Sequence, residues 1–138
     1  MKNYNYKKNP FCIMCGDENP HSFGLNFKNE EDGAVFAVYN ARKELQGYRG
    51  VMHGGMISAI LDSAMFHCLY FQNVEAMTGE LKVRYRKSVP CEKDFLVKAK
   101  VVNSRSPLYK LEAQIICEDE ILVSAAAKFM QIERDIDA

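Results

Sequence analysis

The 138-residue chain has no excess of charge of either sign, because 18 basic residues balance 18 acidic ones. This balance argues against broad electrostatic capture of nucleic acid or of an anionic membrane. No apolar run reaches the roughly 20 residues that a membrane-spanning helix needs. The polar first ten residues lack the apolar core of a secretory signal. We therefore expect a cytoplasmic protein that binds neither nucleic acid nor membrane.

The number and spacing of the cysteines do not fit a disulfide framework or a closed metal site. The five cysteines are an odd number, which suits free thiols in a reducing compartment. Cys12 and Cys15 have the spacing of half a zinc site, but a structural zinc site needs four ligands. There is no second Cys-x-x-Cys pair, and His21 is the only other candidate ligand nearby. We expect no metal and a packing role for this loop.

The chain shows no internal repeat, and its length and 48% hydrophobic content fit one domain with a real core. Residues 1–22 resemble an irregular arm, which leaves residues 23–138 as the domain. Strand-like runs at 23–28 and 34–40 flank an Asp-Gly pair that is typical of a hairpin. Residues 41–52 are predicted to be a loop. Four further strand-like runs follow the helix described next: 76–87, 94–104, 108–117 and 121–132.

Residues 54–71 are predicted to form a helix with apolar side chains on almost every face, which indicates burial. One buried helix surrounded only by strands, in the order β-β-α-β-β-β-β, predicts an α+β hotdog fold. In that fold a curved antiparallel sheet wraps one long central helix. Asp62 is the only charged residue on this helix. Because burying a carboxylate has a large desolvation cost, Asp62 needs either a partner or a task.

His53, Gly54 and Gly55 immediately precede or begin this helix. Backbone N–H groups at a helix start lack intrahelical partners, and the helix dipole adds positive potential there. Two glycines let a ligand oxygen approach these amides closely, so an oxyanion site for a carbonyl is chemically plausible. The alternative is that the glycines only permit a tight turn into the helix.

The spacing between this triplet and Asp62 constrains any shared chemistry. Nine residues separate His53 from Asp62, which places them about 13 Å apart along a helix axis. One carbonyl cannot contact the helix start and Asp62 of the same chain. If both act together, a second subunit must supply one of them, which predicts a homodimer or a dimer of dimers.

Three stretches together resemble the acyl-CoA thioesterases of the hotdog superfamily, and among them the phenylacetyl-CoA thioesterases. Residues 45–64 (LQGYRGVMHGGMISAILDSA) carry the most specific likeness, and residues 78–90 (TGELKVRYRKSVP) match the family's next strand. The lead-in resembles that of many members at residues 12–16 (CIMCG), 19–20 (NP) and 24–25 (GL). The likeness covers roughly residues 11–132.

This resemblance implies a thioesterase site at a dimer interface, without a metal or redox cofactor. Asp62 matches the family's catalytic carboxylate, which acts as general base on water or as nucleophile. The Gly55 amide would polarise the thioester carbonyl, with Gly54 and His53 close by. Thr78 occupies the position of a Ser or Thr that helps to hold the attacking water.

The loop before the helix departs from the family pattern. Several relatives carry an amide or an acid six residues before the histidine, where this chain has Gly47. Gln46, one position earlier, is a candidate substitute. This departure keeps open a non-catalytic acyl-CoA-binding module as an alternative to hydrolysis. A second alternative is a hotdog dehydratase of hydroxyacyl thioesters, which usually pairs a histidine with a carboxylate.

Several further residues could have either a functional or a purely structural role. Lys82, Arg84 and Arg86 alternate along one strand and so share a face, where they could meet the phosphates of coenzyme A or simply be solvated. His67 is expected to be a hydrogen-bonded interior histidine. Ser58, one turn before Asp62, could hydrogen-bond Asp62 or ease close helix packing. Five methionines could fill the core or line an acyl pocket: Met14, Met52, Met56, Met65 and Met77.

Overall fold

The computed structural model describes residues 9–132. The first eight residues of the predicted arm and the last six of the predicted domain lie outside the described residues. The elements, in chain order, are β1 (Lys28–Asn29), β2 (Val35–Asn40), a 3-10 helix (Lys43–Leu45), α1 (Gly54–Tyr70), β3 (Ala76–Tyr85), β4 (Asp94–Arg105), β5 (Leu108–Cys117) and β6 (Glu120–Gln131). The helix and the last four strands begin and end within two residues of their predicted bounds.

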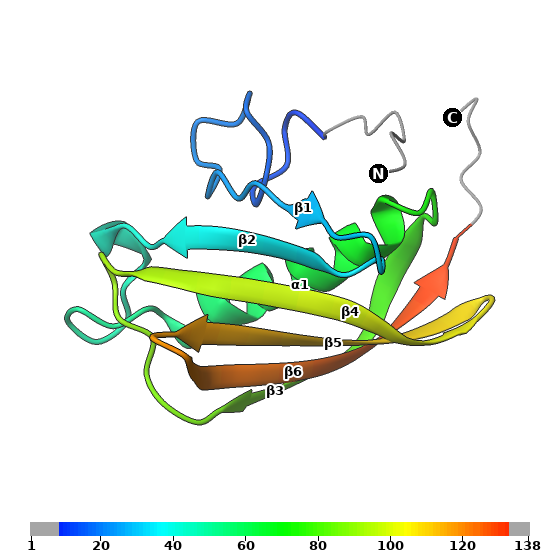
Figure 1. Ribbon diagram of the computed structural model, residues 1–138. Helices are drawn as coiled ribbons and strands as arrows, with labels where there is room; N and C mark the ends of the chain where they lie inside the picture. The colour runs from blue at the N-terminus through cyan, green and yellow to red at the C-terminus, as the bar shows by residue number, and fades with distance from the viewer. Residues whose placement is uncertain (1–8, 133–138) are drawn as a thin grey trace.

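All six strands form one antiparallel sheet in the order β1-β2-β4-β5-β6-β3. Figure 1 shows α1 lying along one face of this sheet, which curves around it. The core lies between them, where Ile60, Leu61 and Met65 of α1 are fully buried together with Val97 of β4 and Ile115 of β5. Burial of each such side chain stabilises the fold by about 1.5–3 kcal/mol. The predicted hotdog architecture is confirmed.

The first predicted strand is mostly wrong. Residues 23–27 alternate between buried and exposed side chains, as the sequence pattern indicated, with Phe23, Leu25 and Phe27 buried. Their backbone nevertheless pairs elsewhere, because the amides of Phe23 and Leu25 donate to the carbonyls of Ile13 and Met14 in the preceding loop. Only Lys28–Asn29 joins the sheet, through the hairpin with β2.

Burial around α1 is less complete than its apolar sequence predicted. The helix start from Gly54 to Met56 is exposed, and a half-buried stripe continues along one side of α1 through Ser58, Ala59, Asp62, Phe66 and Tyr70. Asp62 is therefore half-buried rather than buried. The reason is that the sheet covers the other sides of the helix and leaves this stripe beside the edge strand β3.

β3 forms one edge of the sheet and pairs only with β6 among the described residues. Its register shifts between Thr78 and Glu80, so Gly79 is an extra residue in a β-bulge. Thr78 lies opposite the buried Phe129 and thus faces α1. Without the bulge, strict alternation would have placed Thr78 on the outer face with Lys82 and Arg84.

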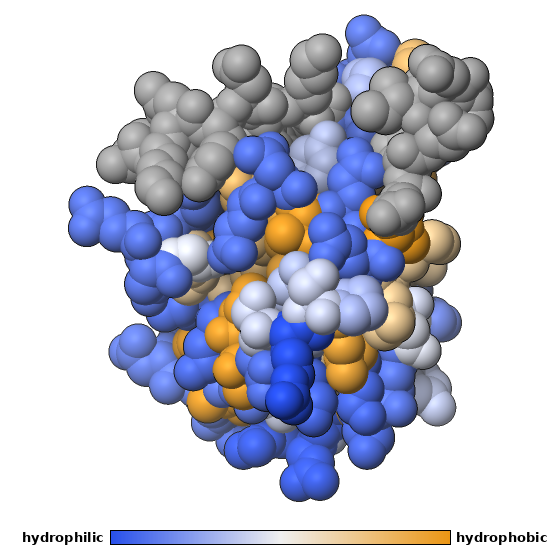
Figure 2. Space-filling view, turned by 90° about the vertical axis from the view of Figure 1, so that its right-hand side faces the viewer, coloured by the Kyte–Doolittle hydropathy of each residue, from blue (hydrophilic) through white to orange (hydrophobic). Residues whose placement is uncertain are grey.

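Apolar side chains reach the surface at the end of the molecule where β3 begins and the β4–β5 turn lies. Met77, Val102 and Met130 are all exposed there. In Figure 2, which looks onto this end, hydrophobic side chains appear in separate patches between hydrophilic ones. No helix within residues 9–132 is both long enough and apolar enough to cross a membrane.

Candidate active site

The first turn of α1 carries one backbone donor that remains open. His53 is the N-cap residue, and its imidazole Nδ1 accepts a hydrogen bond of 2.9 Å from the Gly55 N–H. The His53 carbonyl accepts from the amides of Met56 and Ile57 at 3.0 and 3.1 Å. The Gly54 N–H, which is exposed, donates to no acceptor within residues 9–132. The amide singled out from the sequence, that of Gly55, is thus occupied by His53, while that of Gly54 is open.

Asp62 has a polar partner from the edge strand. The Thr78 hydroxyl donates a hydrogen bond of 2.5 Å to Oδ1 of Asp62, so two of the residues singled out from the sequence are in direct contact. The carboxylate lies on the half-buried stripe of α1, where water and ligands have access. Ser58 does not hold Asp62: its hydroxyl lies 2.6 Å from the Tyr85 hydroxyl instead.

Tyr85 is a polar residue of this region that the sequence reasoning missed. It lies opposite the buried Val123 of β6 and therefore on the helix-facing side of β3. Its hydroxyl donates to the carbonyl oxygen of Gly54 at 2.7 Å. The alternation of Leu81, Val83 and Tyr85 along one face was available in the sequence as a signal. It did not reveal which atom of α1 the hydroxyl would meet.

The open amide and the carboxylate are well separated within one chain. Asp62 follows Gly54 by eight positions in a continuous helix, which corresponds to about 12 Å along its axis. The structure thus brings Asp62 together with Thr78, and His53 together with Gly54 and Gly55. It does not bring these two groups together within a single chain.

The loop before α1 places Gly47 against His53. A side chain at Gly47 would begin 3.3 Å from the His53 Cα, which is tighter than ordinary contact, so glycine permits this approach. Gln46 uses its side-chain oxygen to accept a hydrogen bond of 3.0 Å from the Gly50 N–H. The side-chain carbonyl of Gln46 therefore stabilises the turn between residues 46 and 50.

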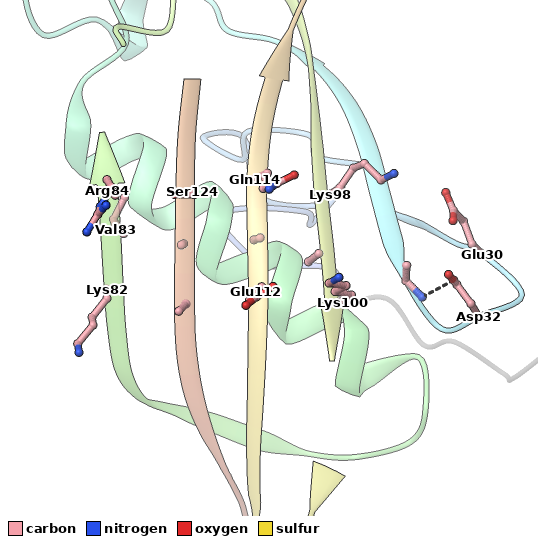
Figure 3. A pocket seen from close by; sticks show the side chains of 15 residues that line it. Glu30, Asp32, Lys82, Val83, Arg84, Lys98, Lys100, Glu112, Gln114 and Ser124 are labelled. Atoms are coloured by element: carbon pink, nitrogen blue, oxygen red, sulfur yellow. Dashed lines mark hydrogen bonds between the residues drawn. The ribbon is translucent and has the colours of Figure 1, made fainter. Parts of the chain in front are cut away.

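Lys82 and Arg84 lie on the outer face of the sheet, opposite to the Asp62 side. They pair in register with Ala126 and Ser124 of β6 and border a hollow of about 830 Å³ on that face. Figure 3 shows this hollow with α1 behind the strands. Asp62, Thr78 and Gly54 do not line it, so this hollow is separate from the region around Asp62.

Arg86 follows the end of β3, and its backbone amide donates to the Leu122 carbonyl at 2.9 Å. It does not line the outer hollow with Arg84. The shared face predicted for the three basic residues thus holds for Lys82 and Arg84 and ends with the strand.

The buried histidine and the cysteines do not supply a nucleophile beside Asp62. His67 is buried, as predicted, with its Nδ1 2.7 Å from the Ser63 carbonyl oxygen and its ring against Phe27. Burial raises the pKa of the Cys68 thiol to about 12, so this thiol stays protonated at neutral pH. Desolvation, followed by the charge of Glu92, also raises the pKa of Cys91.

The loop around Cys12 and Cys15 packs on the domain. Cys15 is buried, and the Cys12 sulfur accepts a hydrogen bond of 3.3 Å from the Met14 N–H. No group of three potential metal-ligating side chains occurs in the described part of the chain. The methionines divide between environments, since Met14, Met52 and Met65 are buried whereas Met56 and Met77 are exposed.

Comparisons with known proteins identify the family. The model of the thioesterase superfamily matches residues 49–124, which include the start of α1, Asp62 and Thr78. The acyl-coenzyme A thioesterase THEM4 of Mus musculus is 30% identical over 116 residues, which cover 78% of this chain and 47% of the mouse protein. The chain belongs to the thioesterase superfamily. It spans about half the length of the curated relatives that it matches.

Solved structures agree on the fold. A crystal structure of a thioesterase superfamily protein superposes with a TM-score of 0.82 and 22% identity, covering 86% of this chain and 62% of that one. The PaaI protein of the phenylacetic acid degradation operon of E. coli superposes with a TM-score of 0.74 and 14% identity. That match covers 85% of this chain and 88% of PaaI. At these identities the likeness shows the hotdog fold alone.

Proposed function

We propose that this chain hydrolyses an acyl-CoA thioester to the free acid and coenzyme A, at a site shared by two copies of the chain. One observation carries the proposal: Asp62 lies on the open side of α1 with its carboxylate hydrogen-bonded by Thr78. Membership of the thioesterase superfamily and the likeness to acyl-coenzyme A thioesterase THEM4 support the reaction class.

In the proposed reaction Asp62 takes a proton from a water molecule as the water oxygen attacks the thioester carbonyl carbon. The carbonyl oxygen gains negative charge and accepts a hydrogen bond from the Gly54 N–H. The neighbouring Gly55 amide and His53, hydrogen-bonded to each other, lie beside this oxygen at the start of the helix. The carbon–sulfur bond then breaks, and the coenzyme A thiolate leaves and takes up a proton. Thr78 orients the carboxylate or the water. In the alternative, the Asp62 carboxylate attacks the thioester carbon directly, the carbon–sulfur bond breaks to release the coenzyme A thiolate, and water then hydrolyses the resulting anhydride to the free acid and Asp62.

The second copy is proposed because Gly54 and Asp62 of one chain are too far apart for one carbonyl. Two features support this part of the proposal. The half-buried stripe of α1 carries Phe66 and Tyr70 beside Asp62, and the ten-residue β3 is paired along one edge only within residues 9–132. An open strand edge is a template for pairing with another chain. A second copy packed on α1 and β3 would cover both features and bring its own helix start to Asp62.

For substrate binding we propose that Gly54, Gly47 and Gln46 border the thioester and the adjoining part of coenzyme A. Arg84 and Arg86 are the proposed phosphate contacts, because both lie at the end of β3 that reaches the helix start through Tyr85. Arg84 faces away from Asp62, so its contact requires coenzyme A to pass around the end of β3 near Tyr85, beyond the part of the edge that a second copy would cover. The acyl group would then extend along the stripe toward Phe66 and Tyr70.

Two alternatives make different predictions. An acyl-CoA-binding module would bind coenzyme A esters without turnover, and Gly47 is the departure from the family pattern that favours it. A dehydratase would use a histidine with the carboxylate. Within residues 9–132 no histidine hydrogen-bonds Asp62, and His67 is engaged in the core, which disfavours that reaction.

A hydrolysis screen over a panel of acyl-CoA thioesters, with detection of the released thiol, tests the proposal. The panel should include acetyl-CoA, medium-chain acyl-CoAs and phenylacetyl-CoA, with the Asp62→Asn variant as the blank. Thiol release by the wild-type chain that the variant lacks supports hydrolysis. Tight binding of an acyl-CoA without thiol release would favour the binding module. Loss of water from a hydroxyacyl-CoA would favour the dehydratase.

A further inference from the structure

The peptide group between Gly54 and Gly55 is held at both of its polar ends. Its carbonyl oxygen, that of Gly54, accepts the hydrogen bond of 2.7 Å from the Tyr85 hydroxyl. Its N–H, that of Gly55, donates the bond of 2.9 Å to Nδ1 of His53. A side chain from the edge strand and a side chain from the N-cap therefore fix the same peptide plane.

This peptide lies where the chain most needs an external constraint. Two consecutive glycines have wide conformational freedom, and the first turn of α1 is exposed rather than packed in the core. The preceding peptide, between His53 and Gly54, carries the open N–H. Its carbonyl is held by the amides of Met56 and Ile57. Fixing the peptide on the other side of Gly54 leaves little freedom in the direction of that N–H.

We propose that Tyr85 is a positioning residue for the carbonyl-binding amide of Gly54. This inference rests on the proposed thioesterase function and adds to it a residue that acts through the backbone of α1. Donors that are already aligned with the developing oxyanion stabilise it without a cost of reorganisation. Tyr85 supplies that alignment from β3, which also carries Thr78. In a shared site, β3 of one copy would orient the Gly54 amide and β3 of the other copy would orient the carboxylate.

Ser58 supports the Tyr85 hydroxyl through a second hydrogen bond. The Tyr85 proton is directed to the Gly54 carbonyl, so the Ser58 hydroxyl donates its own proton to the tyrosine oxygen at 2.6 Å. Ser58 thereby limits rotation of the tyrosine hydroxyl. Its removal should have the same effect as loss of the tyrosine hydroxyl, but a smaller one.

The test compares Tyr85→Phe with the wild-type chain in both kinetics and binding. Loss of one neutral hydrogen bond predicts a fall in kcat/KM of roughly three- to tenfold. Binding is measured with two unreactive analogues of the preferred acyl-CoA. One is a ketone in which CH₂ replaces sulfur, and the other is a thioether that lacks the carbonyl. For a two-carbon acyl group these are acetonyl-dethia-CoA and S-ethyl-CoA.

Tyr85→Phe should weaken binding of the ketone analogue by up to the factor seen in kcat/KM and leave binding of the thioether unchanged. Ser58→Ala should weaken binding of the ketone analogue less than Tyr85→Phe does. Tyr109→Phe is the matched control, since its hydroxyl bonds Gln131 at 3.3 Å far from Gly54 and its loss should leave the ratio of the two affinities unaltered. Equal weakening of both analogues, or of neither, would overturn the positioning role. If the wild-type chain releases no thiol from any acyl-CoA, the proposed function fails instead, and these two failures are distinguishable.

Discussion

The Thr78 hydroxyl and the Asp62 carboxylate meet at 2.5 Å across the gap between β3 and α1. Asp62 is the only charged residue on the helix, and the hydroxyl approaches it from the edge strand. The half-buried position keeps the carboxylate accessible, while Oδ1 accepts the hydrogen bond from Thr78. In the proposed reaction this is where the base and the attacking water meet.

Substituting Asp62 by asparagine should remove the base while preserving its shape and its bond from Thr78. We expect turnover to fall by about 10²–10⁴, the usual scale for loss of a general base. Asp94→Asn is the matched control, because Asp94 is exposed and also accepts one side-chain hydrogen bond, from Asn40 at 2.8 Å. Steady-state thiol release by the two purified variants provides the measurement. A folded Asp62→Asn protein with near-normal turnover would refute the assignment.

Thr78 should support the reaction without forming a covalent intermediate. Thr78→Ser keeps the hydroxyl and should be mild, whereas Thr78→Ala loses the hydrogen bond that the hydroxyl donates to the carboxylate and should lower kcat by roughly ten- to a hundredfold. No histidine in the described part of the chain hydrogen-bonds Thr78 to activate it as a nucleophile. Mass spectrometry of the protein quenched during turnover checks this: an acyl ester on Thr78 would contradict the supporting role.

The position of Thr78 shows where sequence reasoning stops. The period of two correctly predicted β3, and the apolar run correctly predicted α1. Strict alternation, however, assigns Thr78 to the face of Lys82 and Arg84. The bulge at Gly79 moves it to the helix side, and a single glycine in a strand indicates such a bulge without fixing which side chains it redirects. The resemblance to thioesterases, rather than the periodicity, identified Thr78.

The sequence also does not predict which backbone donor at the helix start stays open. The sequence predicts that amides at Gly54 and Gly55 lack intrahelical partners, but it does not say which one a neighbouring side chain will occupy. His53 turns its imidazole onto Gly55, and Tyr85, 31 residues later, reaches the Gly54 carbonyl. Both outcomes depend on rotamers and on the packing of β3, which local patterns do not encode.

Burial of Cys68 should make the folded state less stable at alkaline pH. Its pKa is about 12 in the folded protein, above the value of an unfolded thiol. Between those two values the unfolded chain releases a proton that the folded chain retains, so stability is complete below the unfolded pKa and falls as pH rises. The expected loss is about 1.4 kcal/mol for each pH unit above the unfolded value. Urea titrations at pH 8 and pH 10 measure it.

The variant Cys68→Ala is the control for this pH dependence, because all other titrating groups are shared. Its free energy of unfolding should be lower at pH 8, owing to lost packing, but should decline less between pH 8 and pH 10. Parallel declines in the two proteins would show that Cys68 does not titrate as described.

The Gly54 amide can be removed selectively by proline. Gly54 is the first helical residue, a position that favours proline, and the extended backbone of His53 (φ −62°, ψ 133°) is what a residue before proline requires. Gly54→Pro should therefore fold normally and lose about 10²–10³ in kcat, the scale of an oxyanion donor. Gly54→Ala retains the N–H, and its methyl group would lie 3.7 Å from the Tyr85 ring, an ordinary contact. Normal turnover by Gly54→Pro would exclude this amide as the carbonyl donor.

A site shared by two chains can be tested by mixing two inactive variants. Asp62→Asn chains keep the helix start, and Gly54→Pro chains keep the carboxylate. In a mixed dimer one site combines both defects and the other combines both intact partners. Random exchange in a symmetric dimer should restore about a quarter of wild-type activity. Light scattering first establishes that the wild-type chain is at least dimeric at assay concentration.

Subunit exchange is verified independently by giving one variant an affinity tag and recovering the untagged variant with it. Recovery of activity then depends on exchange and should rise with the fraction of mixed dimers. A site contained within one chain predicts no recovery at any mixing ratio, since every chain carries one defect. Verified exchange without recovery, or an active monomer by sedimentation, would therefore contradict the shared site and require Asp62 to act without a second chain's Gly54.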